Sequence, residues 1–192
     1  MLYFGQQYSL YLSSVSKSNY FLGHGIPDSR PLKDGDIVNI DITCYFGGYH
    51  GDTSRTIEIG KVDQKGIDLV EATKIALQVG IDVVGPGVKF SSIGLEISKY
   101  AEGLGFGVDD AFCGHGIGEN FHMPPLVQHC KNNEKDIMRE GMIFTIEPIF
   151  VQGMTGFRKW DDDWTACTLD GGRAAQFEHT ILVTSYGSQI LT

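Results

Sequence analysis

The stretches "LKDGDIVNID", residues 32–41, and "MREGMIFTIE", residues 138–147, are two copies of one pattern. Each copy opens with an apolar residue, a base, an acid and a glycine. Each then runs through apolar positions to a carboxylate, Asp41 in the first copy and Glu147 in the second. A segment that recurs within a chain predicts a fold built from two related halves.

The first copy predicts a strand followed by a tight hairpin. Residues 37–44 alternate between apolar and polar side chains, and Asp41 lies on the polar face. Residues 46–49, "FGGY", indicate a two-residue turn, because successive glycines adopt positive φ at little steric cost. A second strand is expected over residues 49–59.

The rest of the chain switches between helical and strand-like patterns. The expected elements are a helix over 65–84 ended by the "GPG" of 85–87, a helix capped by Ser91 or Ser92 and ended by the glycines of 103–107, a glycine-rich loop over 113–122, a strand in the second copy, and a turn and strand over 170–183. This order of hairpin, helices, loop and strands predicts an α+β fold with an internal pseudo-repeat.

The hairpin brings two acids together. If Gly47 and Gly48 form the loop, Asp52 lies opposite Thr43, and Asp41 lies two residues along on the same face. The Cβ atoms of such diagonal neighbours are roughly 7 Å apart or less. Two carboxylates that close repel each other, so we expect them to share a proton or to hold a cation.

A second pair of acids lies in the second half. Glu147 and Glu178 occupy the polar faces of their strands, although the long connection leaves the register between them open. Two divalent cations would neutralise the four carboxylates. His115, between glycines in "CGHGIG" (113–118), adds an imidazole, and such a donor set suits Mn, Fe, Co or Zn. A metal pair activates water and polarises a carbonyl, which predicts hydrolysis of an amide or a phosphate ester.

Composition limits the class of protein. The 192 residues are 42% hydrophobic and carry a formal net charge of −9, which argues against nucleic acid or an anionic membrane as a main partner. No apolar run approaches the length of about 20 residues that crosses a bilayer. The four cysteines are scattered, with no CxxC pair, and predict a reducing compartment. A cytoplasmic location is expected, with organelle targeting left open.

Each candidate residue also has a structural interpretation. Asp41 alone fits an acid at a strand end, His115 fits a loop histidine bonded to the backbone, and His24 fits a turn before Pro27. A structural role is the expectation for His129 and His179. The repeat favours the metal site, because chance rarely places matched acids at the ends of two ten-residue copies.

Several motifs together resemble the type I methionine aminopeptidases. They are "HGIPD" (24–28), "VNIDIT" (38–43), "YHGDTSRT" (49–56), "CGHGIG" (113–118), "FH" (121–122), "FTIEP" (144–148) and "QFEHT" (176–180). The short spacing from His115 to Glu147 is similar to type I, since type II carries a large helical insertion there. The resemblance implies the α+β pita-bread fold, with two pseudo-symmetric halves and a curved antiparallel sheet flanked by helices.

The resemblance also implies two divalent metal ions, Co, Mn, Fe or Zn, and a set of ligands for them. Asp41 would chelate one ion, and His115 and Glu147 would hold the other. Asp52 and Glu178 would bridge the two ions.

The same resemblance implies roles in catalysis and substrate binding. Glu147 would also take a proton from the attacking water. His122 would hydrogen-bond the scissile carbonyl and its oxyanion, and His24 would contact the leaving amide side. Phe121 and Trp164 would line an apolar pocket for the methionine side chain, and only small second residues would fit beyond the scissile bond.

The implied protein is a monomeric metallo-aminopeptidase with one catalytic domain over residues 1–192, in which residues 1–20 are atypical or truncated. Its expected partners are the N-termini of peptides or nascent proteins, with ribosome association left open. Val15 and Gly23 stand where the family often has cysteine. Two alternatives remain: an X-Pro aminopeptidase or prolidase-like peptidase of the same fold, and a non-catalytic binding module that has kept the fold.

Overall fold

The structure is a computed structural model that describes residues 2–3, 9–13, 21–26, 29 and 31–192. Its elements, in chain order, are β1 (Leu2–Tyr3), β2 (Ser9–Ser13), β3 (Phe21–Gly23), β4 (Ile37–Phe46), β5 (Tyr49–Glu58), α1 (Gln64–Asp82), α2 (Ser91–Leu104), β6 (Gly107–Val108), β7 (Gly114–Gly116), β8 (Met123–Val127), β9 (Ile143–Ile146), β10 (Ile149–Val151), β11 (Phe157–Lys159), β12 (Ala166–Thr168), β13 (Ala174–Thr184) and β14 (Gly187–Ile190).

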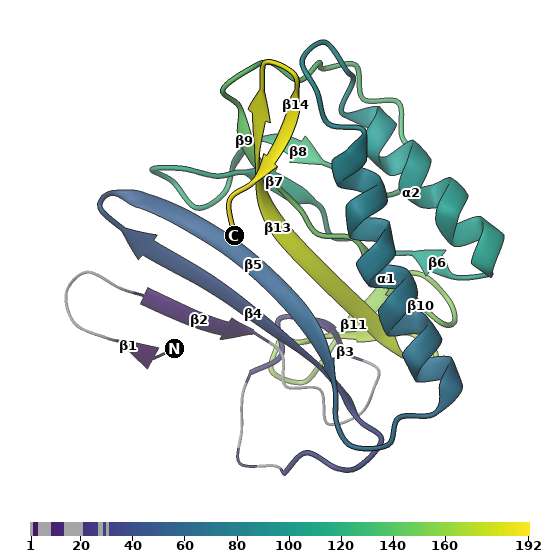
Figure 1. The fold of residues 1–192 in the computed structure, drawn as a ribbon. Helices are drawn as coiled ribbons and strands as arrows, with labels where there is room; N and C mark the ends of the chain where they lie inside the picture. Colours follow the sequence, from purple (N-terminus) through teal and green to yellow (C-terminus); the bar gives the residue numbers. More distant parts are fainter. Residues whose placement is uncertain (1, 4–8, 14–20, 27–28, 30) are drawn as a thin grey trace.

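One large sheet organises the molecule. Its strands run in the order β1-β2-β4-β5-β13-β9-β7-β8, with β10 and β14 also paired to β13 and β6 paired to β10. A small second sheet has the order β11-β12-β3. The long strands β5 and β13 cross the molecule side by side, and α1 and α2 cover one face of the large sheet (Figure 1). The predicted α+β architecture is confirmed.

The predicted hairpin is confirmed in its register. Gly47 and Gly48 have φ values of 60° and 94°, as a type I′ turn requires. Asp52 pairs with Thr43 across β4 and β5, and Asp41 pairs with Ser54. The two carboxylates therefore lie on one face of the hairpin, as diagonal neighbours.

The two sequence copies take equivalent places in the sheet. β4, from the first copy, lies outside β5, and β9, from the second copy, lies outside β13. β5 and β13 pair directly at the centre, for example through Thr53 and His179. The two halves therefore meet along β5 and β13, which explains why the repeat leads to one shared site.

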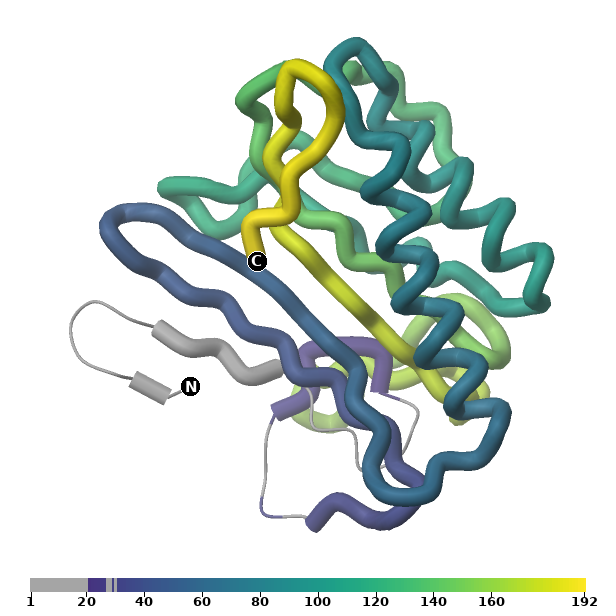
Figure 2. The backbone as a smooth tube through the Cα atoms, in the orientation of Figure 1, coloured from purple at the N-terminus to yellow at the C-terminus, as the bar shows by residue number. Residues whose placement is uncertain are grey.

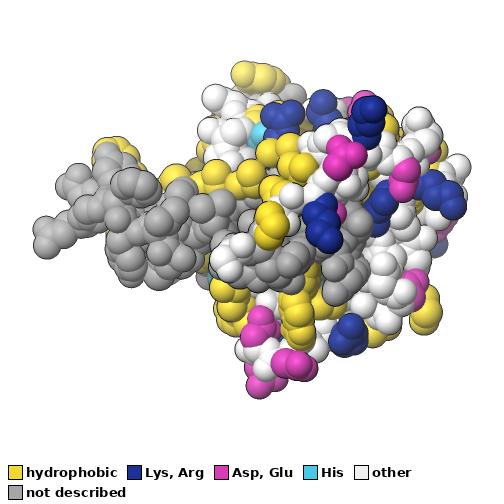
Figure 3. All heavy atoms as spheres, turned by 90° about the horizontal axis from the view of Figure 1, so that it is seen from below, with side chains coloured by type: hydrophobic (Ala, Val, Ile, Leu, Met, Phe, Trp, Pro, Cys, Tyr) yellow, Lys and Arg dark blue, Asp and Glu magenta, His cyan; other side chains and the backbone are white. Residues whose placement is uncertain are grey.

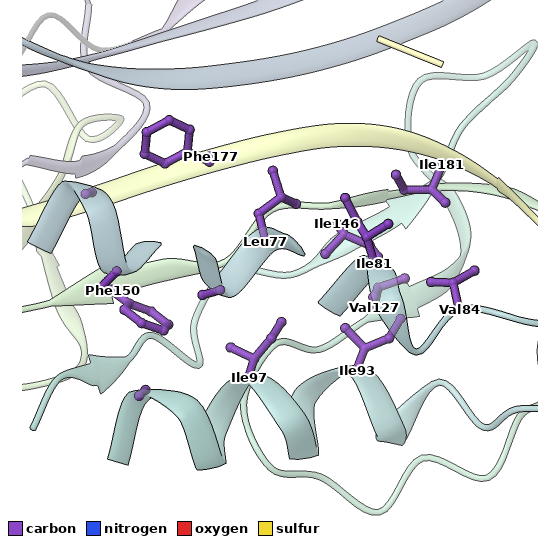
Figure 4. Close-up of a cluster of buried hydrophobic side chains, with 14 of the residues drawn as sticks. Leu77, Ile81, Val84, Ile93, Ile97, Val127, Ile146, Phe150, Phe177 and Ile181 are labelled. Carbon is purple, nitrogen blue, oxygen red and sulfur yellow. The ribbon is translucent and has the colours of Figure 1, made fainter. Parts of the chain in front are cut away.

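The hydrophobic core fills the space between the helices and the sheet. Figure 4 shows Leu77 and Ile81 of α1 and Ile97 of α2 packed toward Ile146 and Phe177 of the sheet. Each such side chain stabilises the fold by about 1.5–3 kcal/mol when fully buried. Because side chains alternate along a strand, this packing turns the polar positions of β13 to the opposite face.

The end of the chain lies beside the central strand pair (Figure 2). Leu191 donates its N–H to the carbonyl of Thr180 at 2.9 Å, and the Thr192 hydroxyl accepts the N–H of Thr180 at 3.0 Å. The same hydroxyl donates to the carbonyl of Asp52 at 3.2 Å. These bonds close the gap between β5 and β13 just beyond their ladder.

Both predicted helices are present, but the predicted serine cap of α2 is wrong. The N-cap is Phe90, whose backbone is already helical at φ −59° and ψ −34°, and no side chain caps this end. Ser92 instead donates its N–H to the carbonyl of Lys89, so the turn starts before either serine. The α1 cap is Asp63, whose Oδ1 accepts the Gly66 N–H at 2.9 Å.

Other differences concern short elements. The expected glycine-rich loop of 113–122 contains β7, and β8 runs through the proline pair that follows it. The small sheet of β11, β12 and β3 was not predicted. Val15 and most of residues 1–20 lie outside the described residues, so the expectation about that segment stays a prediction. Within the described residues, neither helix has the length and apolar character needed to cross a membrane.

Candidate metal centre

Five neighbouring strands bring one predicted ligand each to the same face of the sheet. In spatial order, β4 carries Asp41, β5 carries Asp52, β13 carries Glu178, the end of β9 leads into Glu147, and β7 carries His115. β13 pairs with β9 before residue 147 (Ile146 with His179) and with β10 after it (Ile149 with Gln176), in one continuous register. Glu147 therefore lies opposite Glu178. The structure thus fixes the register that the sequence left open.

The functional atoms of this group lie close together. His115 Nε2 is 3.8 Å from Glu147 Oε1 and 4.0 Å from Asp52 Oδ2. Ligand atoms of Asp52, His115 and Glu178 all lie within 4.8 Å of one another, and these three residues are buried. Asp41 and Glu178 flank Ser54 on the neighbouring strands.

Glycines and a threonine aim the His115 ring. A Cβ at Gly114 would collide with the backbone carbonyl of Thr145, so only glycine lets β7 approach β9 this closely. The His115 N–H donates to Thr145 Oγ1 at 3.0 Å, and its Nδ1 donates to the Gly116 carbonyl at 3.1 Å. A carbonyl only accepts, so Nδ1 carries the proton and Nε2 presents its lone pair to the acids.

The chain alone does not neutralise these acids. Burial, together with the nearby charge of Asp41, raises the pKa of Asp52 to about 7. Burial and, to a smaller extent, the charges of Asp52 and Asp41 together raise the pKa of Glu147 to about 8. The pKa of Glu178 lies well above its usual value for the same reasons. Each shift indicates a carboxylate that needs a cation or a proton.

The donor set fits divalent metal. Oε1 of Glu178 is buried and has no hydrogen-bond partner among the described residues, as expected for an oxygen aimed at a cation. Carboxylates with one imidazole are ligands that Mn, Fe, Co and Zn accept. Cations would also relieve the repulsion that raises the pKa values of these acids.

Three further residues hold Glu147, and sequence reasoning assigned them no role in the site. Thr145 Oγ1 donates to Glu147 Oε1 at 2.8 Å, and Gln176 Nε2 donates to Oε2 at 3.2 Å. His129 Nε2 accepts the Glu147 N–H at 3.0 Å, and burial lowers the pKa of His129 to about 3. Thr145 and Gln176 lie on the same strand faces as the acids, and this placement was the only indication in the sequence that they contribute to the site.

His122 and Phe121 lie next to the ligands. The His122 ring centroid is 4.4 Å from that of His115, and Phe121 stacks on His122 at 4.1 Å. The His122 residue is exposed overall. The part of its ring that is buried lowers its pKa, and the nearby His50 lowers it further. The rings of His122 and Phe121, two predicted substrate contacts, therefore both lie against His115, a predicted ligand.

His24 and Trp164 belong to a second aromatic group, near His122. Trp164 stacks on His24 with the ring centroids 5.1 Å apart. Phe112, to which the sequence analysis gave no role, lies edge-on to His24 with the ring centroids 5.3 Å apart. His24 has a positive φ of 58°. Burial and the nearby His122 lower the pKa of His24. Trp164 and Phe121 contact different histidines, so their shared methionine pocket stays a prediction.

The comparisons with known proteins place this geometry in a family. The model of "Metallopeptidase family M24" matches residues 4–185. This chain belongs to that family. The pita-bread fold expected from the resemblance is thereby confirmed.

Relatives within the family are methionine aminopeptidases. "Methionine aminopeptidase 1B, chloroplastic" of Arabidopsis thaliana is 52% identical over 180 residues, which are 94% of this chain and 49% of that protein. The crystal structure of methionine aminopeptidase from Rickettsia prowazekii has a TM-score of 0.87 at 41% identity, covering 93% of this chain and 71% of that one. The predicted resemblance to methionine aminopeptidases is confirmed.

A prolidase shares the fold at lower similarity. The prolidase from Pyrococcus horikoshii has a TM-score of 0.75 at 25% identity, covering 95% of this chain and 47% of that one. The chain spans about half the length of the curated relatives it matches. The Arabidopsis relative is named chloroplastic, and a cytoplasmic location for this chain stays a prediction.

Proposed function

We propose that this chain is a metal-dependent aminopeptidase that removes the N-terminal methionine from peptides and nascent proteins whose second residue is small. The observation that carries the proposal is the set of four acids and one histidine that five neighbouring strands bring to one face of the sheet, where ligand atoms of Asp52, His115 and Glu178 lie within 4.8 Å of one another. Similarity to methionine aminopeptidases over 94% of the chain supports the choice of substrate. We also propose that the chain acts as a single catalytic domain.

The proposed cofactor is a pair of divalent cations from the group Mn, Fe, Co and Zn. Asp41 would bind one ion, His115 and Glu147 the other, and Asp52 and Glu178 would bind both. Divalent ions in such a site supply Lewis acidity toward the scissile carbonyl and lower the pKa of water. The uncompensated burial of Glu178 Oε1 among the described residues supports this assignment.

Glu147 is the proposed general base. Its two oxygens are held by Thr145 and Gln176, so its carboxylate has a fixed orientation in which to accept the proton of the attacking water. His129 holds the main chain of the same residue. A base acts efficiently only within hydrogen-bond reach of the proton it removes, and these three contacts provide that positioning.

The histidines and aromatic residues around the ligands are the proposed substrate contacts. His122, beside His115, would donate a hydrogen bond to the carbonyl oxygen as negative charge develops on it. His24 would contact the amide on the leaving side. Phe121 and Trp164 would contact the methionine side chain, which is long, flexible and apolar and therefore suits an aromatic surface.

Cleavage of defined peptides tests the proposal. The purified chain with added Mn or Co should release methionine from Met-Ala-Ser and leave Ala-Pro-Ala intact. Faster cleavage of the Ala-Pro peptide would favour the prolidase-like alternative. Bound metal with no cleavage of either peptide would favour the binding-module alternative.

A further inference from the structure

The loop of residues 117–122, between β7 and β8, carries both His122 and Phe121. His122 is exposed, and residues 117–122 form neither helix nor strand. For His122 to meet a developing charge, this loop has to keep a fixed position relative to the metal ligands. A displacement of about 1 Å at such a site can lower the rate by about 10²-fold.

His50, on β5, attaches this loop to the first half of the molecule. Its backbone N–H and its ring Nδ1 each lie 2.9 Å from the carbonyl oxygen of Gly118. Because a carbonyl oxygen only accepts, Nδ1 must carry the proton, and one carbonyl receives two hydrogen bonds from one residue. The contact crosses 68 residues of sequence, from the β4–β5 hairpin of the first half to the loop of the second half.

The same ring continues into the substrate-binding group. His50 stacks on Phe121 at 5.6 Å with an interplanar angle of 21°, and Phe121 stacks on His122 at 4.1 Å. Phe121 also meets the edge of His115 at 5.5 Å. His50 also contacts its cross-strand partner Tyr45, with the two ring centroids 4.5 Å apart. The rings of the loop are therefore held between a strand residue and a metal ligand.

His50 lies on the same strand as Asp52, one of the proposed metal ligands. His50 and Asp52 are two residues apart on β5, so their side chains project from the same face of the strand. The strand that carries the proposed bridging carboxylate thus also fixes the loop that carries His122. We propose that His50 is a positioning residue that sets the place of His122 and Phe121 relative to the metal ligands. The kinetic part of this inference rests on the proposed function.

Two substitutions separate the hydrogen bond from the stacking. His50→Asn keeps an N–H donor at the same distance along the side chain as Nδ1 but removes the ring. His50→Phe keeps the ring and removes the side-chain donor, and His50→Ala removes both, while the backbone N–H of residue 50 can still donate to Gly118 in every variant. Tyr49→Ala is the matched control, because Tyr49 lies in the same hairpin, is 59% exposed and projects from the other face of β5.

The first measurement is amide hydrogen exchange of residues 117–122 in the Mn-loaded protein. We expect exchange in this loop to rise on the order of tenfold in His50→Ala, to return toward the wild-type rate in His50→Asn, and to be unchanged in Tyr49→Ala. Equal exchange in the wild type and His50→Ala would overturn the proposal. This result does not depend on any peptidase activity.

The second measurement is the steady-state cleavage of Met-Ala-Ser. We expect His50→Ala to lower kcat by about 10–100-fold, with a smaller change in KM, and His50→Asn to recover most of the loss. In a His122→Ala background the same substitution should have little further effect, since His50 acts through His122. Equal losses in both backgrounds would overturn the proposal. If the wild-type protein cleaves no methionyl peptide, the proposed function fails while the exchange result still stands.

Discussion

Raising the pH from 7 to 8 should destabilise the metal-free protein. Burial raises the pKa of Asp52 to about 7 and that of Glu147 to about 8, whereas carboxyls of an unfolded chain titrate near about 4. In this range the native state holds protons that the unfolded state has already released, so the free energy of unfolding falls as the pH rises. The slope is about 1.4 kcal/mol per pH unit for each retained proton.

Histidine titration would change the free energy of unfolding in the opposite direction, but it contributes little between pH 7 and 8. Burial lowers the pKa values of His24, His115 and His122, so these groups stabilise the fold as the pH rises toward about 6.5, the value for an unfolded chain. Above about pH 7 they are largely neutral in both states, and the carboxyls dominate. At roughly 2–4 °C per kcal/mol for a chain of this size, one retained proton lowers Tm by roughly 3–6 °C between pH 7 and 8.

Added metal should reverse the trend. Mn or Co that binds the native site stabilises it by about 2.7 kcal/mol at a hundredfold excess over Kd. The gain should be larger at pH 8 than at pH 7, because metal and protons compete for the same carboxylates. Glu178→Gln removes one of the repelling acids, so the Tm of the metal-free variant should depend less on pH. Added metal should raise the Tm of this variant much less than that of the wild type.

Thermal melts followed by circular dichroism, with EDTA and with added Mn at pH 7.0, 7.5 and 8.0, measure all of these effects. Metal analysis of the same samples is the control. A Tm in EDTA that is flat or rises across this range would refute the reasoning about strained, buried acids. Coinciding melts in samples that differ in measured metal content would refute it as well.

Three further substitutions test single residues. Asp52→Asn should weaken metal binding in a calorimetric titration, because the proposed bridging carboxylate loses its charge toward both ions, and unchanged affinity for two ions would contradict the ligand assignment. His122→Ala should lower kcat by about 10²–10³-fold with little change in KM, the usual effect of losing one oxyanion donor, whereas a raised KM alone would assign His122 to ground-state binding. Gly114→Ala should lower both Tm and metal affinity, because its Cβ would collide with the Thr145 carbonyl and displace His115, and a wild-type melt with normal metal binding would argue against that close approach.

Charged side chains of both signs lie on the surface of the described part of the molecule (Figure 3). Viewed from below, acidic and basic side chains both appear on the described part of the molecule, with several acidic side chains grouped at the lower edge of the view (Figure 3). The acids behind the formal charge of −9 include the buried Asp52 and Glu178 of the candidate site.

The sequence by itself determined the features that depend on local order. The alternation of residues 37–44 and the glycine pair at 47–48 were enough to place Asp41 and Asp52 on one face in the observed register. The repeat predicted two related halves and a second pair of acids. Period and turn chemistry act over a few residues, so they can be read without knowing the rest of the fold.

Only the tertiary structure decided how the halves meet. The pairing of β5 with β13 places Glu178 beside the first pair of acids, and the register of β9 places Glu147 opposite it. The contacts of His129 with Glu147 and of His50 with Gly118 link residues 18 and 68 positions apart. No local sequence period encodes such contacts. The helices pack on one face of the sheet, and the pairing of distant strands places polar residues from both halves side by side on the other face.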